Sequence, residues 1–439
     1  MSRRPFPRFP DFSRRRTVDD HLDRLDTHGV SRREFLALMS AAAAVGAVGL
    51  PGTAIASSSG KLAYLTFNLN EYNTIASAAF DDAARAFSLP YVALDGRSDG
   101  QRQVNQFEQQ IVAGSAGAVF NLADGSAIRR IAADAQQNNV FFGNFWNTLP
   151  WYTPFDASEH YTLYAVPEEF AAHRAVTSEL LKAVTEHFGG GDIVAVTGTD
   201  GYVTDIARSR GRDAAFADFP KTRLVDHLPG NWNREDGLKA TDALLSRNPN
   251  VVGIVAQNDD IAQGVLAALR ARGLRPGHDV LVVGADGTAE AVRAIIKGEQ
   301  LATSGNSPAY AAGLFTARIY DVTHGWKPRA AERALNWRSL TITKANADVY
   351  RKRFVDNGKV APFDYRRLSR VAHPTDWDLQ AEVYPLDFEK EWTGIARPAG
   401  YTLPEAYRQA RANGEFETVA AEYKAHYTIP FGGPSPVHA

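Results

Sequence analysis

The sequence predicts an α/β protein with two doubly wound parallel-sheet lobes, followed by a C-terminal extension. Short segments that are apolar throughout alternate along the chain with longer segments whose apolar residues recur at helical spacing. Strands that are apolar on both faces belong to parallel sheets covered by helices on each side. The strand segments fall into two groups of four, which indicates two lobes of similar size rather than one large sheet.

Eight segments are expected to be strands because each is a short apolar run. In chain order they are 61–67, 91–94, 117–122, 140–144, 192–198, 222–228, 251–257 and 280–286. Apolar residues at helical spacing predict helices at 74–87, 101–114, 127–138, 170–184, 203–219, 234–247, 259–273 and 289–299. The chain is expected to cross from the first group to the second near residues 147–155.

The segment 251–273 shows the passage from strand to helix most clearly. An apolar run ends in Gln257, Asn258, Asp259 and Asp260, and apolar residues then return at helical spacing. Aspartate is a frequent N-cap, so one of the two aspartates is expected to cap the helix. Asn258 is then expected to face the crevice that forms at the carboxyl ends of parallel strands.

The composition is that of an ordinary soluble protein. The chain has 439 residues and a net charge of −2, with 22% charged and 44% hydrophobic residues. This balance does not indicate a nucleic-acid or membrane-surface partner. The chain has no cysteine, which excludes disulfides, thiol catalysis and cysteine-based metal sites. No motif indicates a cofactor.

Residues 1–56 have the pattern of a secretory signal. The paired arginines Arg32 and Arg33 are followed by Phe35, Leu36 and a short apolar run rich in alanine. This arrangement predicts export by the twin-arginine route, with cleavage after Ala56. The alternative, a membrane anchor, is disfavoured because the apolar run is too short for a comfortable span.

Polar and aromatic residues follow the strands of both lobes. The carboxyl ends of strands in open α/β sheets border the ligand crevice. Amides and carboxylates bond hydroxyl groups, and aromatic rings cover C–H faces, so these residues predict a site for a hydroxyl-rich ligand. The candidates by position are Asn70, Tyr72, Asn144, Trp146, Arg208, Asn258 and Asp286.

The segments AQNDDIAQGVLAALRARG and VLVVGADGTAEAVRAIIKGEQLATSGNSP resemble the second lobe of the type I periplasmic sugar-binding proteins of ABC importers. The likeness covers about residues 60–345. It implies sugar-binding roles for Asn258, Asp286, Asn306 and Arg208, with Asn70 and Tyr72 from the first lobe. It also implies that the protein is a periplasmic monomer and a binding protein, not an enzyme. Such a protein takes up a sugar or polyol without covalent chemistry and docks on a membrane permease.

The resemblance further implies a hinge of three chain crossings, near 147–155, 305–309 and 330–338. The first lobe is then expected at 57–150 and 307–332, and the second at 151–306 and 333–345. The ligand would bind both lobes at once and favour their closure.

Some residues depart from the family pattern. Asn144-Phe145-Trp146 stands where many members have an Asp-Arg pair, and Asn306 stands where many have glutamine. Arg208 and Asp286 would roughly offset each other, which leaves a nearly neutral cleft. A neutral pentose, tetritol or pentitol is the expected ligand.

Purely structural roles for these residues, and other functions for the protein, stay open at this point. Asp286 is also a plausible turn residue, Arg208 a solvated helix charge, and Trp146 and Trp151 packing residues. A secreted α/β carbohydrate-active enzyme is one alternative, although no catalytic motif is present. A sugar sensor that docks on a chemoreceptor is another. A repressor effector domain would need a DNA-binding segment where the export signal lies.

Residues 346–439 extend beyond the usual end of the family. One helix is expected there, at 404–427, among many aromatic residues. The segment is expected to pack on the lobes as an appendage. A dimerising or partner-docking element, or a segment that narrows the mouth of the cleft, is the alternative.

Overall fold

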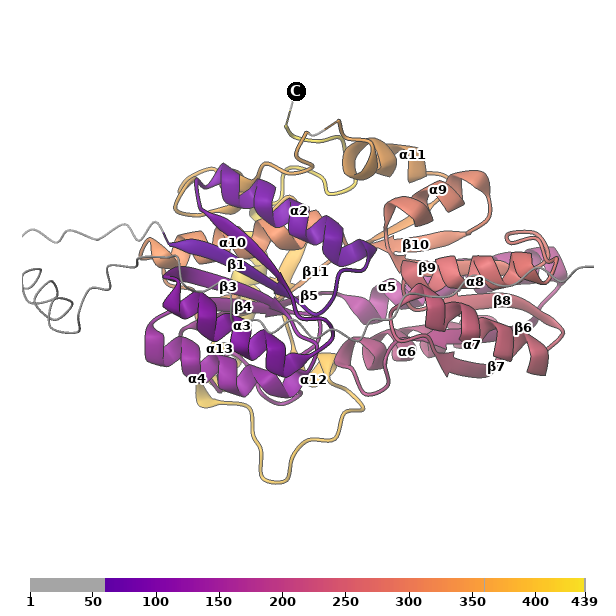
Figure 1. The fold of residues 1–439 in the computed structure, drawn as a ribbon, viewed down its shortest axis with the longest axis horizontal. Coiled ribbons are helices and arrows are strands. Elements are labelled where there is room, and N and C mark those ends of the chain that lie inside the picture. The colour runs from indigo at the N-terminus through magenta and orange to yellow at the C-terminus, as the bar shows by residue number, and fades with distance from the viewer. Residues whose placement is uncertain (1–59, 359, 438–439) are drawn as a thin grey trace, which may run out of the picture. The chain divides into compact units, whose positions relative to one another are not determined.

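The computed structural model describes residues 60–358 and 360–437, so the signal segment expected at 1–56 lies outside the described residues. Two parallel-sheet lobes lie side by side, each with helices on both faces of its sheet (Figure 1). Within the described ranges no helix is both long and apolar enough to cross a bilayer.

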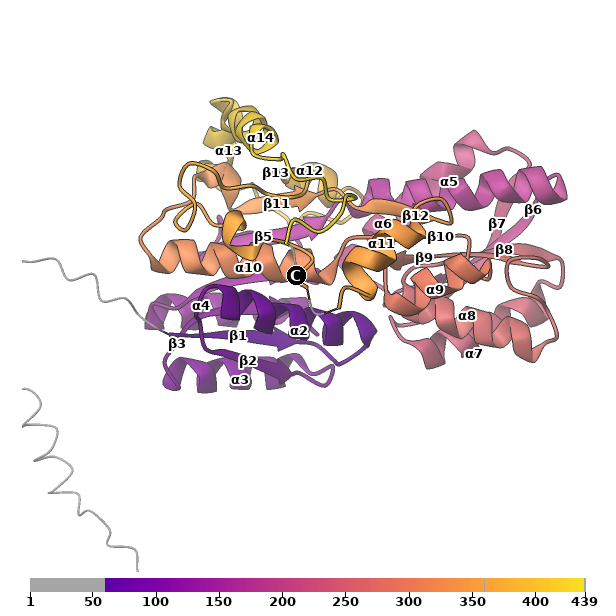
Figure 2. The same cartoon turned by 90° about the horizontal axis from the view of Figure 1, so that it is seen from above.

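The first lobe contains a seven-stranded sheet in the order β13-β11-β5-β4-β3-β1-β2. Its strands are β1 (Lys61–Thr66), β2 (Tyr91–Asp95), β3 (Ser115–Asn121), β4 (Phe141–Phe145), β5 (Tyr161–Pro167), β11 (Ala334–Trp337) and β13 (Val383–Pro385). Helices α2 (Glu71–Ala86) and α10 (Pro308–Thr323) lie on one face, and α3 (Gly100–Val112) and α4 (Ile128–Asn138) on the other (Figure 2). Only β13 runs antiparallel to its neighbour.

The second lobe contains a six-stranded sheet in the order β12-β10-β9-β8-β6-β7. Its strands are β6 (Gly191–Thr197), β7 (Thr222–Pro229), β8 (Val251–Ala256), β9 (Leu281–Asp286), β10 (Ala302–Gly305) and β12 (Leu340–Thr343). Its helices are α5 (Glu169–Phe188), α6 (Val203–Ala215), α7 (Arg234–Arg247), α8 (Asp259–Ala271) and α9 (Ala289–Lys297). Apolar clusters on each face of this sheet form the core of the lobe.

Two of the expected lobe boundaries are wrong. The segment 161–167 pairs with β4 as β5, so the chain first crosses after Pro167 rather than near 147–155. The segment 334–337 pairs with β5 as β11, so the third crossing lies between Trp337 and Leu340. Both strands contain tyrosine, threonine, asparagine or tryptophan within otherwise apolar runs, which hid them from a search for continuous apolar runs. The second crossing, between Gly305 and Pro308, lies where it was expected.

The C-terminal extension packs on both lobes. Helix α11 (Ala347–Tyr350) continues into a π-helical turn and packs with Val292 and Ile295 of α9. The remainder joins the core of the first lobe through β13, α12 (Phe388–Glu391), α13 (Glu405–Ala412) and α14 (Glu415–Ala425). The single helix expected at 404–427 is wrong, because Gly414 has φ +71° and separates α13 from α14.

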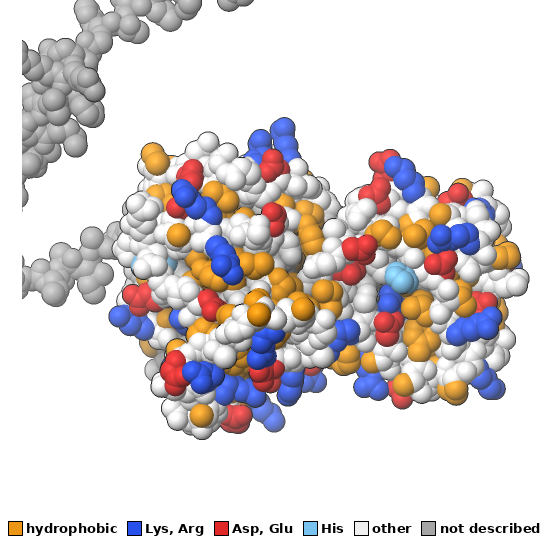
Figure 3. Space-filling view, turned by 90° about the horizontal axis from the view of Figure 1, so that it is seen from below, with side chains coloured by type: hydrophobic (Ala, Val, Ile, Leu, Met, Phe, Trp, Pro, Cys, Tyr) orange, Lys and Arg blue, Asp and Glu red, His pale blue; other side chains and the backbone are white. Residues whose placement is uncertain are grey.

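Charged side chains are mixed on the underside of the molecule. Lysine and arginine alternate there with aspartate and glutamate over both lobes (Figure 3). This face therefore presents no broad area of a single charge sign.

Candidate ligand-binding cleft

A cavity lies between the two lobes, at the carboxyl ends of their parallel strands. Its empty volume is about 480 Å³ including its open mouth, which is within the usual range for small-molecule sites. The lining residues are Phe67, Asn70, Tyr72, Asn73, Asn121, Leu122, Trp146, Asn147, Tyr202, Thr204, Arg208, Trp232, Asn258 and Asp286. Loops at strand ends supply most of these side chains, as expected for an open α/β sheet.

Six of the eight residues predicted from the sequence line this cavity: Asn70, Tyr72, Trp146, Arg208, Asn258 and Asp286. Asn144 and Asn306 lie behind the lining. Asn144 donates from Nδ2 to the carbonyl of Asn147 at 3.1 Å, and Asn306 donates from Nδ2 to Oδ1 of Asp286 at 3.3 Å. Both amides therefore position residues of the lining.

Arg208 is the central cation of the cleft. Its side chain is only 2% exposed, and it donates to Glu169, to the carbonyl of Gln257 and, at 3.0 Å, to Oδ1 of Asp286. These bonds use three of the five N–H donors of a guanidinium, which leaves two for a ligand. Arg208 is therefore a buried site residue and not a solvated helix charge.

Two tryptophan rings flank the guanidinium. Its central carbon lies 5.3 Å from the ring centroid of Trp146 and 5.6 Å from that of Trp232. Such contacts are favourable cation–π interactions. Trp232 fits because residue 198 is glycine, since a Cβ at Gly198 would lie 1.9 Å from the ring. Trp151 packs away from the cleft, edge-on to Trp392 of the extension.

Asp286 presents the carboxylate of the second lobe. Burial raises the pKa of its carboxyl to about 7, and the charge of Glu169 adds to this, although Arg208 opposes it. Burial also raises the pKa of Glu169. Two carboxyls thus share one guanidinium, so the cleft is nearly neutral when one of them holds a proton.

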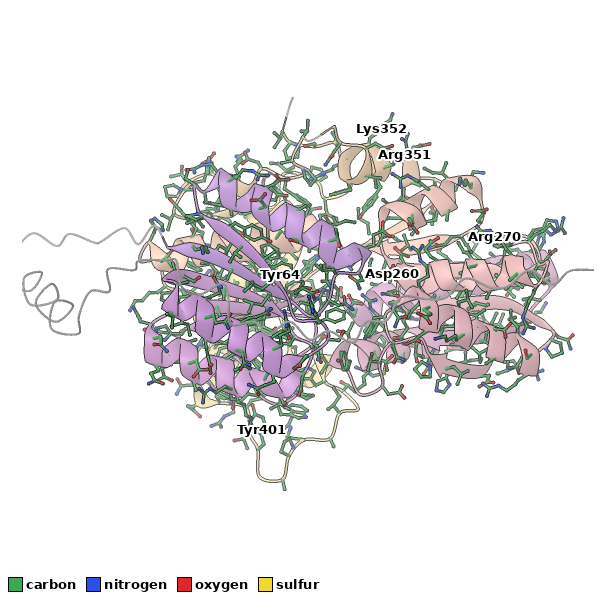
Figure 4. All side chains as sticks on the ribbon, viewed as in Figure 1. Tyr64, Asp260, Arg270, Arg351, Lys352 and Tyr401 are labelled. Atoms are coloured by element: carbon green, nitrogen blue, oxygen red, sulfur yellow. The ribbon has the colours of Figure 1, made fainter. Side chains whose placement is uncertain are left out.

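Asn258 caps helix α8, which corrects the expectation that Asp259 or Asp260 does so. Its Oδ1 accepts from the backbone N–H of Ile261 at 2.9 Å while the side chain also lines the cavity. Asp259 is buried instead and accepts from the N–H of Thr288 and the hydroxyl of Thr303. Asp260 lies at the border between the lobes (Figure 4).

The first lobe contributes a linked set of amides. Oδ1 of Asn73 accepts from the Tyr64 hydroxyl at 3.2 Å and from Nδ2 of Asn121 at 3.0 Å. Tyr64 lies on β1, inside the sheet (Figure 4), so its hydroxyl holds the amides in place from the side of the protein core. The predicted set omitted Asn73, Asn121 and Trp232. Asn121 lies within a predicted strand and Trp232 lies shortly after another, which is the signal that would have found them, whereas Asn73 lies in the first turn of α2.

Two hydrogen bonds join the lobes at the cleft, in addition to the contact between Arg208 and Trp146. The Tyr202 hydroxyl of the second lobe donates to the carbonyl of Ala123 of the first. The Glu71 carboxylate accepts from the N–H of Glu290, in the first turn of α9, at 3.4 Å. The lobes are therefore in contact across the mouth. Within the described part of the chain, no group of three or more histidine, aspartate and glutamate side chains is placed to hold a metal ion.

Residues 65–324 match the family described as periplasmic binding protein domain. The xylitol-binding protein of Mycolicibacterium smegmatis is 26% identical over 275 residues, which are 61% of this chain and 75% of that protein. The D-allose-binding periplasmic protein of Escherichia coli is 36% identical over 120 residues, 27% of this chain and only 38% of that protein.

Solved structures share the fold. A twin-arginine translocation pathway signal protein from Burkholderia phytofirmans has a TM-score of 0.64 at 24% identity, covering 70% of this chain and 96% of its own. An ABC transporter solute-binding protein from Mycobacterium smegmatis with bound glycerol has a TM-score of 0.59 at 22% identity, covering 66% and 96%. The matched family covers more than half of the sequence and the solved structures share the fold, so the chain belongs to the type I periplasmic binding proteins.

Proposed function

We propose that the protein is an exported solute-binding protein that captures a neutral sugar or polyol between its lobes and delivers it to the permease of an ABC importer. The ligand is of the pentose, tetritol or pentitol class. The observation that carries this proposal is the amide-lined cavity at the strand ends of both lobes, with Arg208 and Asp286 paired at its centre.

The chemistry of the lining favours a neutral, hydroxyl-rich ligand. Asn70 and Asn258 use their Oδ1 atoms as helix caps, which leaves their Nδ2 groups as donors. One hydrogen of the Asn258 Nδ2 group points to the carbonyl of Trp232 at 3.4 Å, and the other is available to a ligand. Arg208 has two unused donors, and Asp286 supplies an acceptor. The Trp146 and Trp232 rings offer faces for C–H groups. A strongly charged ligand would disturb the balance between Arg208 and its two carboxyl partners.

The same arrangement favours binding over turnover. Asp286 is the one carboxylate in the described lining of the cavity, and it is held by Arg208 and Asn306. Hydrolysis of a glycoside uses a second carboxyl group across the bond to be cleaved, and this lining supplies none. The relatives described above are binding proteins.

We infer that the protein acts in the periplasm as a monomer, after removal of residues 1–56. Cleavage after Ala56 leaves both lobes whole, because the first strand begins at Lys61. The pattern of Arg32, Arg33 and the apolar run supports the twin-arginine route.

Thermal unfolding against a panel of neutral pentoses, hexoses, tetritols and pentitols tests the proposal. A ligand at a hundred times its Kd stabilises the protein by about 2.7 kcal/mol, which gives a clear rise in Tm. We expect one narrow group of stereoisomers to raise Tm and to be recovered unchanged. Asn258→Ala should abolish the shift, whereas Asn250→Ala, at an exposed turn, should retain it.

Either of two results would reject the proposal. No shift with any member of the panel would mean that the cavity takes another class of ligand. Recovery of a chemically altered compound would favour a secreted carbohydrate-active enzyme.

A further inference from the structure

A second cavity lies where the C-terminal extension faces the beginning of the second lobe, next to β11. Its empty volume is about 1200 Å³ including the part that is open to solvent, compared with about 480 Å³ for the cleft measured in the same way. Glu168, Phe170 and Arg210 form one wall, at the start of α5 and on α6. The extension and β11 form the other walls, through residues that include Tyr384 and Glu391. We call this space the hinge cavity. It shares no lining residue with the cleft.

The walls of the hinge cavity carry more carboxylates than cations. Asp387 forms ion pairs with Arg411 at 3.2 Å and with Lys390 at 3.8 Å, which leaves Arg210 as the remaining cation. Three further carboxylates line the space: Glu168, which lies 3.9 Å from Arg338 outside the cavity, Glu391 and Glu417. Among the described residues, neither Glu391 nor Glu417 has a basic side chain within 4.0 Å.

Arg210 does not neutralise these carboxylates closely. Its guanidinium lies over the Phe170 ring, 5.3 Å from the centroid, and donates to the carbonyl of Lys390 at 3.4 Å. It is therefore held on one wall of the cavity, and its charge acts on Glu391 only at longer range.

Glu391 has the environment of a carboxylate that lacks a cationic partner, although the Asn336 amide favours its ionised form. Burial raises the pKa of its carboxyl to about 8, and the negative charges of Glu169 and Glu168 raise it further than Arg210 lowers it. Nearby, the buried hydroxyl of Tyr384 faces the Glu168 carboxylate, and the Tyr384 ring lines the cavity. A positive group placed here would favour the ionised form of Glu391 and could form a cation–π contact with the Tyr384 ring.

We propose that the hinge cavity binds an organic cation, an ammonium or guanidinium group. Glu391 neutralises its charge, and Tyr384 and Phe170 cover its carbon chain. The cation belongs either to a small amine or to a lysine or arginine side chain of a protein partner, since the chemistry is the same. Because the walls come from both sides of the hinge, occupancy is coupled to the arrangement of the lobes.

Titration calorimetry with two cationic probes and one neutral probe tests this site. The probes are agmatine, the blocked tripeptide Gly-Arg-Gly, and its citrulline counterpart, which has the same shape without the charge. We expect saturable binding of at least one cationic probe and none of the citrulline peptide. Agmatine binding would indicate a small-molecule ligand, and binding of the arginine peptide alone would indicate a partner side chain.

Two variants locate the binding. Glu391→Gln resembles the protonated side chain, so it should fold, and it should weaken the cationic probe at least tenfold. Asn258→Ala alters the cleft and the N-cap of α8, neither of which lines the hinge cavity, so it should leave this binding unchanged. Binding near neutral pH should also release protons, seen as a dependence of the measured heat on the ionisation enthalpy of the buffer.

Three outcomes would overturn the proposal: no saturable binding of either cationic probe up to about 10 mM, equal binding of the citrulline peptide, or binding that survives Glu391→Gln and is lost in Asn258→Ala. None of them bears on the sugar panel, so the two proposals fail separately.

Discussion

Arg208 shows how the fold holds a buried charge. With 2% of its side chain exposed, the guanidinium is stable only because Glu169, Asp286 and a backbone carbonyl accept its bonds. Glu169 was not predicted, since an acidic residue in the first turn of a helix ordinarily serves the helix dipole. Its role comes from the packing of α5 against α6, which no local pattern reveals.

The carboxyl of Asp286 makes stability depend on pH. Its folded-state pKa of about 7 lies above the value of about 3.9 for an unfolded chain, so the folded protein keeps a proton that the unfolded protein has lost. This contribution to stability is complete below pH 4 and is lost as the pH rises towards 7. Asp286→Asn removes the titration.

We therefore expect the unfolding free energy of the wild type, relative to Asp286→Asn, to fall between pH 5 and pH 8. The expected fall is on the order of 2 kcal/mol, at about 1.4 kcal/mol for each pH unit below the pKa. Denaturant unfolding at several pH values measures it. A difference that stays constant, or that grows with pH, would contradict the assigned environment of Asp286.

Much of the candidate site was predictable because strand ends border the crevice. From that rule and the family resemblance we predicted six of the residues that line the cavity. It wrongly placed two asparagines in the lining. Asn144 lies within β4, and its side chain points to Asn147, whereas the side chain of Asn306 points to Asp286. The direction of a side chain at a strand end depends on local φ and ψ, such as φ +61° at Trp146, and sequence spacing does not fix these angles.

Among the elements, the long apolar strands and amphipathic helices of both lobes were predictable from their periodicity. The strands β5, β10, β11, β12 and β13 were missed, because they are short or contain polar and aromatic residues. Four of these five have only three or four residues, too few for an alternating pattern to show. Their pairing is decided by the neighbours that they meet in space.

The part of the extension around Phe388 of α12 packs into the core of the first lobe, so it should contribute to the free energy of unfolding. Its ring is fully buried and lies 4.6 Å from Trp392 and 6.3 Å from Tyr164 of β5, measured between ring centroids. Phe388→Ala should lower the unfolding free energy by about 3–5 kcal/mol. Val349→Ala, at a side chain that is 49% exposed, should change it by no more than about 0.5 kcal/mol. Denaturant unfolding compares the two, and similar small losses would show that the extension is only loosely attached.

Over the whole molecule, ligand capture depends on contacts that form only when the lobes meet. Tyr202→Phe removes the hydroxyl that donates to Ala123 across the cleft. A hydrogen bond of this kind contributes about 0.5–1.5 kcal/mol, so ligand affinity should fall about two- to tenfold, mainly through faster release. Tryptophan fluorescence should report it, because Trp146 and Trp232 line the cavity.

Tyr91→Phe is the matched control for this prediction. The Tyr91 hydroxyl donates to the carbonyl of Ser77 at 2.9 Å, entirely within the first lobe. Its loss should affect stability but not ligand release. Equal effects of the two variants on release would argue against the interlobe contact as part of the capture mechanism.

The order of strands in the first sheet also constrains how the chain folds. The sheet is assembled from residues 61–167, 334–337 and 383–385, with the second lobe inserted between the first two stretches. During synthesis one edge of β5 therefore stays unpaired while residues 168–333 are made. Long-range pairing of this kind slows folding, and a bare edge strand invites pairing with other chains. Nascent or truncated chains that end before β11 should thus be the species most prone to aggregation.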